Sequence, residues 1–574
     1  MVRRRPHHPR ARFATPLLLL GCLAGAGRPE LAAAQRAAPG AGSAALPVAE
    51  PPHPYRPGID VLDYDLTLEL PAAGRSIEGR AVLSVRRIPA PDGARPDTLV
   101  LDLVGLRVDS VLVDGRAVRF GRDAGTIRVP LAAAAGDSFS VAVRYGGEPD
   151  DGLIIGADDR GRWMAFGDNW PNRARHWIPS VDHPSDKATV AWTVRAPASR
   201  RVIANGVLVG ETTAPANGRA TVRWRESRPV PSYVMVIAAA PLVEVPLGSA
   251  ACGRSEFTGC VAQSAYAAPE SRDFLPGPFA EANAIVDFYS AVVAPFPYEK
   301  LAHLQSSTRY GGMENASAIF YNDAGFRDRT LGVRTVAHEV AHQWFGDAVT
   351  PREWPHVWLS EGFATYFAEL WIERSRGDTA FRDGMRELRE KVLSSPVTPA
   401  RPVIDTAQTN LMALLNTNSY EKGAWVLHML RATLGDSAFF LAVRAYYERH
   451  RHATAVTDDL RVEMERASGR ELGWFFDQWL RRPGVVDAEA AWRYDAARGR
   501  LTLSVTQRTG TPPYRFPLML EVVDADGRTR RATVDVPARH AATLDVPLTL
   551  HGAPRSLTLD PDVQLLGTLR AVRQ

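Results

Sequence analysis

Cysteine and long apolar runs are both scarce in this chain of 574 residues. Three cysteines are too few for a fold held together by disulfides, so an apolar core must supply most of the stability. No apolar run reaches the roughly 20 residues that a membrane-spanning helix needs. The sequence therefore predicts a multidomain globular protein without a transmembrane span, and its 45% hydrophobic and 23% charged residues are typical of that class.

Lysine is also rare, with four residues among 68 basic ones, which we interpret as a composition bias without functional meaning. The basic charge is concentrated at the start. Residues 1–34 carry six arginines and one glutamate, a net +5 that exceeds the formal charge of +4 for the whole chain. The remainder is close to neutral, which argues against nucleic acid or an anionic membrane as a partner.

The first 34 residues have the order of a secretory signal peptide. MVRRRPHHPRARFA is basic, PLLLLGCLAGAG is short and apolar, and LAAAQ offers a small-residue cleavage site after Ala34. We therefore predict export to the bacterial periplasm or the extracellular space. The alternative is a lipid anchor at Cys22, because LLGC loosely resembles a bacterial lipoprotein box.

Only Cys252 and Cys260 remain after such cleavage, in the polar loop ACGRSEFTGCVAQ. An oxidising compartment favours one disulfide that closes this loop, whereas two free thiols are the alternative.

Hydrophobic periodicity divides the rest of the chain. Residues 35–56 are rich in Ala, Pro and Gly and predict a flexible linker. Residues 57–246 alternate with period two and predict an all-β domain; in VLDYDLTLEL, one face carries Leu62, Tyr64, Leu66, Leu68 and Leu70. Helical patterns dominate 247–487, and alternation returns in 488–574, which predicts a small C-terminal β-sandwich.

The stretch TVAHEVAHQWFGD contains the strongest chemical signal. On a helix, His338 and His342 lie one turn apart on the same face, a spacing that suits two ligands of one tetrahedral zinc ion. Glu339 points beside the metal, where a base takes a proton from the attacking water. Eighteen residues separate His342 from Glu361, which lies in the first turn of a second helix behind Ser360, the expected N-cap, and is the candidate third ligand. The alternative is a pair of ordinary helix histidines.

Two further stretches accompany this pattern. HEVAH with its eighteen-residue spacing to Glu361 resembles the gluzincin peptidases. YGGMENAS (310–317) upstream and NSYEKGAW (418–425) downstream resemble, in this order, the aminopeptidase N and leukotriene hydrolase family, as do PFPYEKL and ARHWIPSVDHPSDKAT. The resemblance runs from about residue 57 to the end.

The resemblance implies a multidomain α+β fold. An N-terminal all-β saddle-like domain is expected before a thermolysin-like, mainly helical catalytic domain with one zinc ion per chain. The small C-terminal β-sandwich follows, and the sequence predicts no large helical C-terminal domain after it. The active-site cleft is then expected to be open.

The resemblance also implies roles for single residues. Glu314 is expected to bind the free α-ammonium group of a peptide, within a substrate-binding stretch completed by Gly311, Gly312, Met313 and Asn315. Tyr420 matches the family's catalytic tyrosine, whose phenol hydrogen-bonds the oxyanion, and Glu339 is the catalytic base. His428 is interpreted as structural because it lies mid-helix among apolar residues.

Four positions depart from the family pattern. Asp182-His183-Pro184 replaces the usual Asp-Glu-Pro. Gly312 replaces a common alanine. Ala316 replaces a common tryptophan, which predicts a wider pocket for the first side chain. No glutamine precedes Ala174-Arg175, where Asp168 or Asn169 stands instead.

These features predict a zinc aminopeptidase that acts on peptides with a free N-terminus. Two alternatives stay open: a zinc endopeptidase that uses the open cleft and ignores Glu314, and a catalytically dead member that acts as a binding scaffold. The sequence leaves the oligomeric state open.

Overall fold

The computed structural model describes residues 55–90, 93–134, 136–214, 218–508, 512–550 and 552–573. The predicted signal peptide, Cys22 and almost all of the predicted linker lie outside the described residues. Within the described ranges, no helix is long and apolar enough to cross a membrane.

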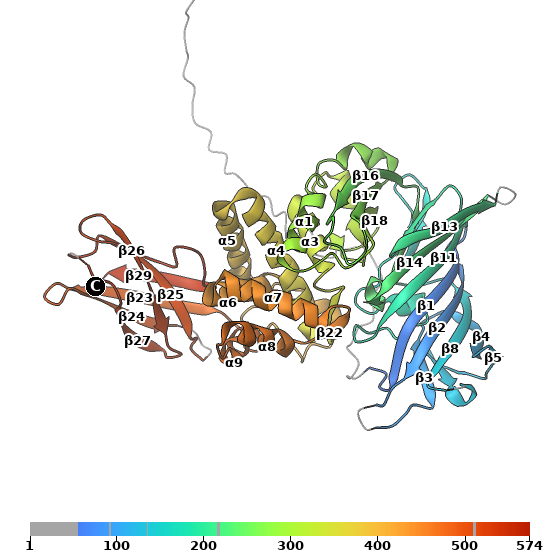
Figure 1. The fold of residues 1–574 in the computed structure, drawn as a ribbon, viewed down its shortest axis with the longest axis horizontal. Coiled ribbons are helices and arrows are strands. Elements are labelled where there is room, and N and C mark those ends of the chain that lie inside the picture. Colours follow the sequence, from blue (N-terminus) through green and yellow to red (C-terminus); the bar gives the residue numbers. More distant parts are fainter. Residues whose placement is uncertain are drawn as a thin grey trace, which may run out of the picture.

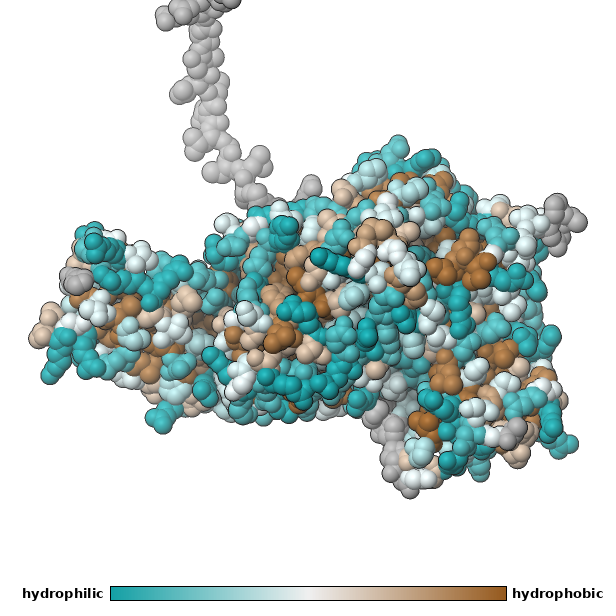
Figure 2. Space-filling view, in the orientation of Figure 1, coloured by the Kyte–Doolittle hydropathy of each residue, from teal (hydrophilic) through white to brown (hydrophobic). Residues whose placement is uncertain are grey.

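Three regions lie in a row (Figure 1): a β-rich N-terminal region, a central helical region and a small C-terminal β region. On the face shown in Figure 2, hydrophilic residues dominate and the apolar ones form separate smaller clusters. The predicted order of β-rich, helical and β regions is therefore confirmed.

An eight-stranded sheet, a four-stranded sheet and a three-stranded sheet make up the N-terminal region, in the orders β13-β14-β11-β1-β2-β8-β4-β5, β12-β15-β10-β9 and β3-β7-β6. Its strands are β1 (Ile59–Glu69), β2 (Ile77–Arg87), β3 (Thr98–Asp102), β4 (Arg107–Val113), β5 (Arg116–Ala117), β6 (Gly121–Arg122), β7 (Thr126–Pro130), β8 (Ser138–Gly147), β9 (Leu153–Ala157), β10 (Trp163–Gly167), β11 (Lys187–Pro197), β12 (Arg201–Ala204), β13 (Val207–Ala214), β14 (Arg219–Pro231) and β15 (Ile237–Ala240).

The predicted inward face of β1 is wrong at one residue. Tyr64, Leu66 and Leu68 are buried, but Leu62 is 39% exposed and Val61 takes the inward place. The register of β1 against β2 shifts between Val61 and Asp63. A β-bulge of this kind adds one residue to a strand and reverses the faces on one side of it.

The central region contains a five-stranded sheet, β16-β17-β18-β20-β19, in which the short strand β19 forms one edge. Its strands are β16 (Val243–Ala250), β17 (Val261–Ala267), β18 (Lys300–Ser306), β19 (Gly312–Met313) and β20 (Ala318–Asn322). Strand β16 crosses the predicted domain boundary at residue 246, because it pairs with β17.

Nine α-helices among the described residues accompany this sheet: α1 (Ala282–Val292), α2 (Asp323–Arg327), α3 (Val333–His342), α4 (Trp358–Arg376), α5 (Asp378–Ser394), α6 (Gly423–Leu434), α7 (Asp436–His450), α8 (Thr457–Ser468) and α9 (Gly473–Leu480). The short strands β21 (Val349–Pro351) and β22 (Ala453–Ala455) pair in parallel. Helix α4 is buried from Trp358 to Ile372, so it forms the centre of this region.

The C-terminal region has a four-stranded sheet, β27-β24-β23-β29, and a three-stranded sheet, β26-β25-β28. The strands are β23 (Val486–Asp495), β24 (Arg500–Gln507), β25 (Phe516–Val523), β26 (Thr529–Val536), β27 (Ala541–Val546), β28 (Ser556–Leu559) and β29 (Gly567–Arg573). His428 of α6 joins this region to the helices, since its Nε2 lies 2.8 Å from the carbonyl oxygen of Val563. His428 is buried in this contact, in agreement with its predicted structural role.

Candidate metal centre and peptide site

Helix α3 carries both predicted histidine ligands on one buried face. His338 and His342 are 2% and 1% exposed, and their rings meet edge to face with centroids 4.7 Å apart. The two Nε2 atoms are 3.0 Å apart and point into the same space. The one-turn spacing of the sequence therefore becomes a pair of convergent nitrogen ligands.

Helix α4 brings the third ligand to the same point. Oε2 of Glu361 lies 3.3 Å from Nε2 of both histidines. A tetrahedral zinc ion with bonds of about 2.05 Å separates its ligand atoms by roughly 3.3 Å, so the three atoms fit one zinc ion. The zinc cofactor predicted from the sequence agrees with this donor set, in which His338, His342 and Glu361 are all buried.

Ser360 has a different role from the predicted one. The α4 helix begins at Trp358 and its N-cap is Val357, so Ser360 lies inside the first turn. Its hydroxyl lies 3.0 Å from Nδ1 of His342, which also lies 3.0 Å from the carbonyl oxygen of Phe345. Such partners on the far nitrogen orient a metal-binding imidazole. The sequence did not predict this contact, because Ser360 and His342 meet only when α3 packs on α4.

The electrostatics of the cluster favour a cation. Burial lowers the pKa of His338 to about 4, but the carboxylates of Glu314 and Glu361 outweigh burial at His342 and raise its pKa to about 10. Burial, then the neighbouring Glu361, raises the pKa of Glu314 to about 7, although His342 opposes this. Three buried carboxylates therefore surround two imidazoles, and a divalent ion relieves their repulsion.

Glu339 lies beside the ligands with its carboxylate against strand β19. It is 1% exposed, and its Oε1 has no hydrogen-bond partner among the described residues. Burial, with the nearby carboxylates of Glu314 and Glu361, raises its pKa well above the ordinary value, while His342 opposes the shift. A raised pKa suits a carboxylate that must accept a proton. A Cβ atom on Gly312 would lie 2.0 Å from Oε1 of Glu339, so glycine leaves room for this position.

The glycine-rich stretch forms the free edge of the sheet. Asn322 donates its backbone N–H to the carbonyl oxygen of Gly311 at 3.1 Å, and Gly312 is paired with Tyr321. Because the hydrogen bonds of antiparallel pairs alternate, the N–H and C=O of Gly312 point away from β20. A peptide can therefore add to this edge as a further strand.

The acidic and amide residues of this stretch are buried next to the metal ligands. A carboxylate oxygen of Glu314 lies within 4.8 Å of ligand atoms of Glu339 and His342. Asn315 is fully buried, and within the described ranges its side-chain amide has no hydrogen-bond partner. Met313 is 3% exposed and lies beside Glu314 in the pocket wall.

Tyr420 reaches the same space from a π-helical turn, Asn418–Lys422, that precedes α6. Its ring stacks on His338 with centroids 6.1 Å apart. Burial, followed by the adjacent Glu361 carboxylate, raises the pKa of Tyr420 well above its ordinary value. The phenol therefore keeps its proton and can act as a hydrogen-bond donor.

A small pocket opens beside the ligands, and the structure brings the predicted residues together in it. Its wall contains residues from all three predicted motifs, Trp170 from the N-terminal region, and Leu415: Trp170, Tyr310, Gly312, Met313, Glu314, Glu361, Leu415 and Tyr420. Trp170 was not predicted. Its ring packs edge-on against Tyr310 at 6.1 Å and Trp354 at 5.3 Å. Its position follows from the packing of the N-terminal region on the helices, which has no local sequence signal.

The residues that stand in place of the family's glutamine, Asp168 and Asn169, are fully buried. Asp168 is ion-paired with Arg173 and Arg309 at 3.1 Å each, and Asn169 donates to the carbonyl oxygens of Ser232 and Met235. Neither residue lines the pocket. Ala316 is buried and its carbonyl accepts a hydrogen bond from Asn205, so it does not widen the pocket as expected.

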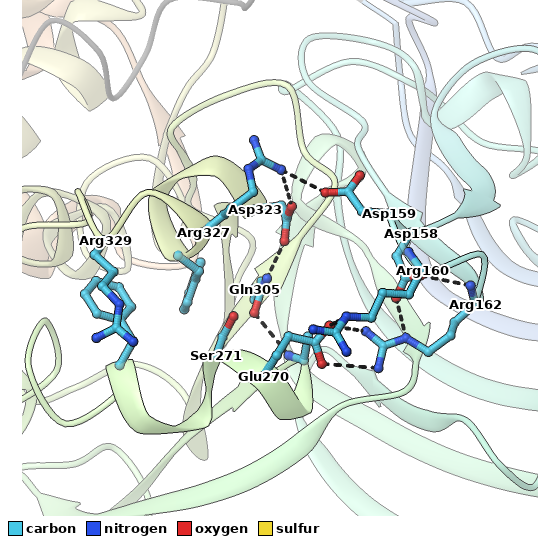
Figure 3. A pocket seen from close by; sticks show the side chains of 13 residues that line it. Asp158, Asp159, Arg160, Arg162, Glu270, Ser271, Gln305, Asp323, Arg327 and Arg329 are labelled. Carbon is cyan, nitrogen blue, oxygen red and sulfur yellow. Dashed lines mark hydrogen bonds and ion pairs between the residues drawn. The ribbon is translucent and has the colours of Figure 1, made fainter.

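A separate cavity of about 460 Å³ lies where the β9–β10 hairpin meets the central region (Figure 3). Ion pairs ring it: Arg162 contacts Glu270 at 2.6 Å, and Arg327 contacts Asp159 at 3.2 Å. The metal ligands are not among its lining residues. The first pair is partly exposed and the second is exposed, so these links between two regions carry little stability individually.

Comparison with known proteins agrees with this geometry. The peptidase family M1 domain matches residues 280–479, and the peptidase M1 N-terminal domain matches residues 63–234. The chain is 25% identical over 458 residues to the leucyl aminopeptidase of Saccharolobus solfataricus, covering 74% of this chain and 55% of that protein. It is 28% identical over 460 residues to the aminopeptidase N of Streptomyces lividans, covering 74% of this chain and 51% of that protein. The chain thus spans about half the length of these curated relatives.

A solved structure is matched over nearly its whole length. A mutant of an M1 zinc metallopeptidase from Deinococcus radiodurans, bound to a Tyr-Ser-Ala substrate, is 28% identical with a TM-score of 0.64. The match covers 74% of this chain and 94% of that one. The resemblance inferred from the motifs is confirmed: the chain belongs to peptidase family M1, the gluzincin family that includes aminopeptidase N.

Proposed function

We propose that this protein is a zinc-dependent aminopeptidase that removes the first residue from peptides with a free N-terminus. One observation carries the proposal: the Glu314 carboxylate lies in the metal pocket, within 4.8 Å of ligand atoms of Glu339 and His342. A buried carboxylate at this place holds a cationic amine at a fixed short distance from the metal ligands. Only the first peptide bond of a substrate then reaches the reactive position.

The remaining residues divide the chemistry. Zinc held by His338, His342 and Glu361 would supply a Lewis acid that polarises the scissile carbonyl and acidifies a water molecule. Glu339 takes the proton of the attacking water and passes it to the leaving amine. Tyr420 donates its O–H to the carbonyl oxygen as negative charge develops there. Gly312 and its neighbours on β19 hold the substrate backbone as an added strand.

The pocket wall supports a preference for an apolar first residue. The wall presents the aromatic and apolar surface of Trp170, Tyr310, Met313 and Leu415, and Glu314 is part of the same wall. Aromatic side chains pack well against such walls. The Deinococcus structure with bound Tyr-Ser-Ala supports the same class of substrate.

The finer architecture and the location belong to this proposal. The N-terminal region (57–246) would be saddle-like, the central region (247–487) thermolysin-like, and the C-terminal region (488–574) a β-sandwich. Export to the periplasm or beyond, after removal of residues 1–34, is supported by the basic and apolar start of the chain and by the Cys252–Cys260 disulfide of the structure.

The test compares two substrate panels on zinc-loaded protein: aminoacyl-naphthylamides with free amines, and the same compounds N-acetylated. We expect hydrolysis of the free set alone, with Phe, Tyr and Leu ahead of Asp and Lys. Glu339→Gln is the inactive control, which must keep its zinc. Hydrolysis of both sets would identify an endopeptidase. Activity on neither panel and on no longer peptide, with zinc bound, would identify a binding scaffold.

A further inference from the structure

Residues 314–317, here named the anchor loop, carry Glu314 and are held by a neighbouring glutamine side chain. Gln343 follows His342 at the end of α3 and is fully buried. Its Nε2 donates to the carbonyl oxygen of Glu314 at 2.8 Å, and its Oε1 accepts the backbone N–H of Ser317 at 2.8 Å. One amide therefore fixes both ends of the loop to the helix that carries the histidines.

The C-terminal end of the anchor loop, Ser317, has an uncommon backbone conformation. Ser317 has φ of +59°, in the left-handed region that is unfavourable for a non-glycine residue. Its hydroxyl donates to Oε2 of Glu226 at 3.0 Å and accepts the backbone N–H of Gly206 at 2.7 Å. The Lys300 ammonium donates to its carbonyl oxygen at 2.7 Å. These contacts compensate for the strained backbone.

The N-terminal region supplies most of this second support. Glu226 of β14 is fully buried. Asn205, next to Gly206 after β12, donates its side-chain N–H to the carbonyl oxygen of Ala316 at 2.7 Å. A Cβ atom on Gly206 would lie 1.8 Å from the carbonyl oxygen of Arg225, so the chain can approach this closely only as glycine. The anchor loop is thus held between α3 and the N-terminal region.

This support opposes a repulsion inside the site. Glu314 lies among the carboxylates of Glu339 and Glu361, and like charges in a buried space push apart. A loop of four residues without fixed ends would move Glu314 away from them. The distance between Glu314 and the metal ligands therefore depends on the clamps at both ends of the loop.

We propose that Gln343 and Glu226 are positioning residues that set Glu314 at the distance from the metal at which a free amino terminus is recognised. The inference rests on the proposed function and identifies the residues that make the proposed aminopeptidase selective for a free amine. Selectivity for the amine then requires the N-terminal region, although none of the proposed metal ligands lies there.

The test uses two zinc-binding compounds that differ only in the amine: phenylalanine hydroxamate and its des-amino counterpart, 3-phenylpropionyl hydroxamate. Their dissociation constants on the zinc-loaded full protein are measured by calorimetry. A charge-assisted contact with Glu314 should make the amine compound bind about 10- to 100-fold more tightly. Gln343→Met should reduce this ratio roughly tenfold, with the des-amino affinity and the zinc content unchanged.

Gln478→Met is the matched control. Gln478 of α9 makes the same two-way amide clamp, donating to the carbonyl oxygen of Arg515 at 2.9 Å and accepting its N–H at 2.8 Å. This variant should lose comparable stability and keep the ratio. Glu226→Leu should lower the ratio as Gln343→Met does, and Glu226→Gln, whose amide oxygen still accepts from Ser317, should restore it.

Three results would overturn the inference. The first is a parallel loss of affinity for both compounds, which indicates a general structural role. The second is an unchanged ratio in Gln343→Met and Glu226→Leu. The third is a wild-type protein that does not prefer the amine compound. Peptide hydrolysis on the naphthylamide panel is measured separately, so failure of the inference is distinguishable from failure of the proposed function.

Discussion

Tyr420 shows how one side chain can be separated from the fold around it. Its ring stacks on His338, and its raised pKa keeps the hydroxyl protonated. Tyr420→Phe removes the donor and leaves the stacking in place. We expect a loss of about 10²-fold or more in kcat, as for other oxyanion donors, with zinc content and Tm close to wild type. A kcat within about threefold of wild type would contradict the assigned role.

His303 of β18 is a residue-scale source of acid sensitivity. Its Nδ1 lies 3.0 Å from the Tyr321 hydroxyl, and its Nε2 lies 3.1 Å from Oε1 of Gln263. Burial, then the Lys300 charge, lowers its pKa to about 3, whereas an unfolded histidine has a pKa of about 6.5. Between these values the unfolded chain binds a proton that the folded chain does not. Its contribution to stability is therefore complete above about pH 6.5 and is lost as the pH falls.

The check is the slope of Tm against pH between about 4 and 7. His303→Gln cannot titrate, so its Tm should depend less on pH than that of the wild type, whatever its absolute value. Equal slopes would show that other groups control the acid response.

Single residues also show what the sequence could predict. His338 and His342 share one helix, so their spacing alone fixed their relative position, and the carboxylate of Glu361 was found at a fixed offset. Trp170, Ser360 and Gln343 were missed or misassigned. Each of them acts through a contact with an element that is distant in the sequence. Serine and glutamine are also common in ordinary helices, so nothing in the local sequence marks these residues.

At the scale of elements, the crossing of α4 and α6 brings the third ligand to Tyr420. A Cβ atom on Gly362 would lie 2.9 Å from the carbonyl carbon of Gly423, so the two helices touch through glycine backbones. Gly362→Ala should push the helices apart, at a cost of about 1–3 kcal/mol, and weaken zinc binding at the neighbouring Glu361.

Zinc affinity by competition with a chelator, together with Tm, checks this prediction. Gly325→Ala in α2 is the control, because its added Cβ would meet nothing closer than Leu331 at 3.5 Å. If both variants behave alike, the helix crossing is not what limits the site.

The Cys252–Cys260 disulfide closes a loop with a sequence separation of 8. The loop also carries Glu256, which pairs with Arg228 of β14 at 2.9 Å and with His452 before β22 at 2.7 Å. Replacing both cysteines with serine should lower the free energy of unfolding by about 2–3 kcal/mol, from the larger entropy of the open unfolded chain. Urea unfolding measures this free energy. Dithiothreitol should lower the free energy of unfolding of the wild type and leave that of the double serine variant unchanged. An unchanged urea midpoint would contradict the prediction.

Elements differ in how well the sequence predicts them. The alternating strands of the two β regions were predicted from one buried and one exposed face. The central sheet was not predicted, because β18 is buried at Leu301–Ser306 without alternation and β20 at Ala318–Tyr321. Strands that are covered on both faces are buried along their whole length, so their hydropathy does not alternate with a period of two. This is the usual case in parallel sheets. The edge position of β19, on which the proposed binding of a peptide as an added strand depends, therefore could not be predicted from the sequence.

At the scale of the whole molecule, metal binding and stability are linked. The ligands come from α3 and α4, the buried centre of the protein, and the apo site leaves three carboxylates in repulsion. Zinc at about 100 times its dissociation constant should stabilise the fold by about 2.7 kcal/mol. Calorimetry should show a lower Tm in EDTA and recovery with zinc. His342→Gln should lose most of this response, and a full response in that variant would place the stabilising zinc elsewhere.

Trp170, Asn205 and Glu226 reach the site or its anchor loop from the N-terminal region, and this has a consequence for protein engineering. The N-terminal and central regions therefore cannot be exchanged between relatives as independent domains. A chimera that pairs this central region with the N-terminal region of a relative should still bind zinc but lose its selectivity for peptides with a free amino terminus. Recombination libraries built on this chain should therefore keep Trp170 and residues 203–234 together with residues 310–343.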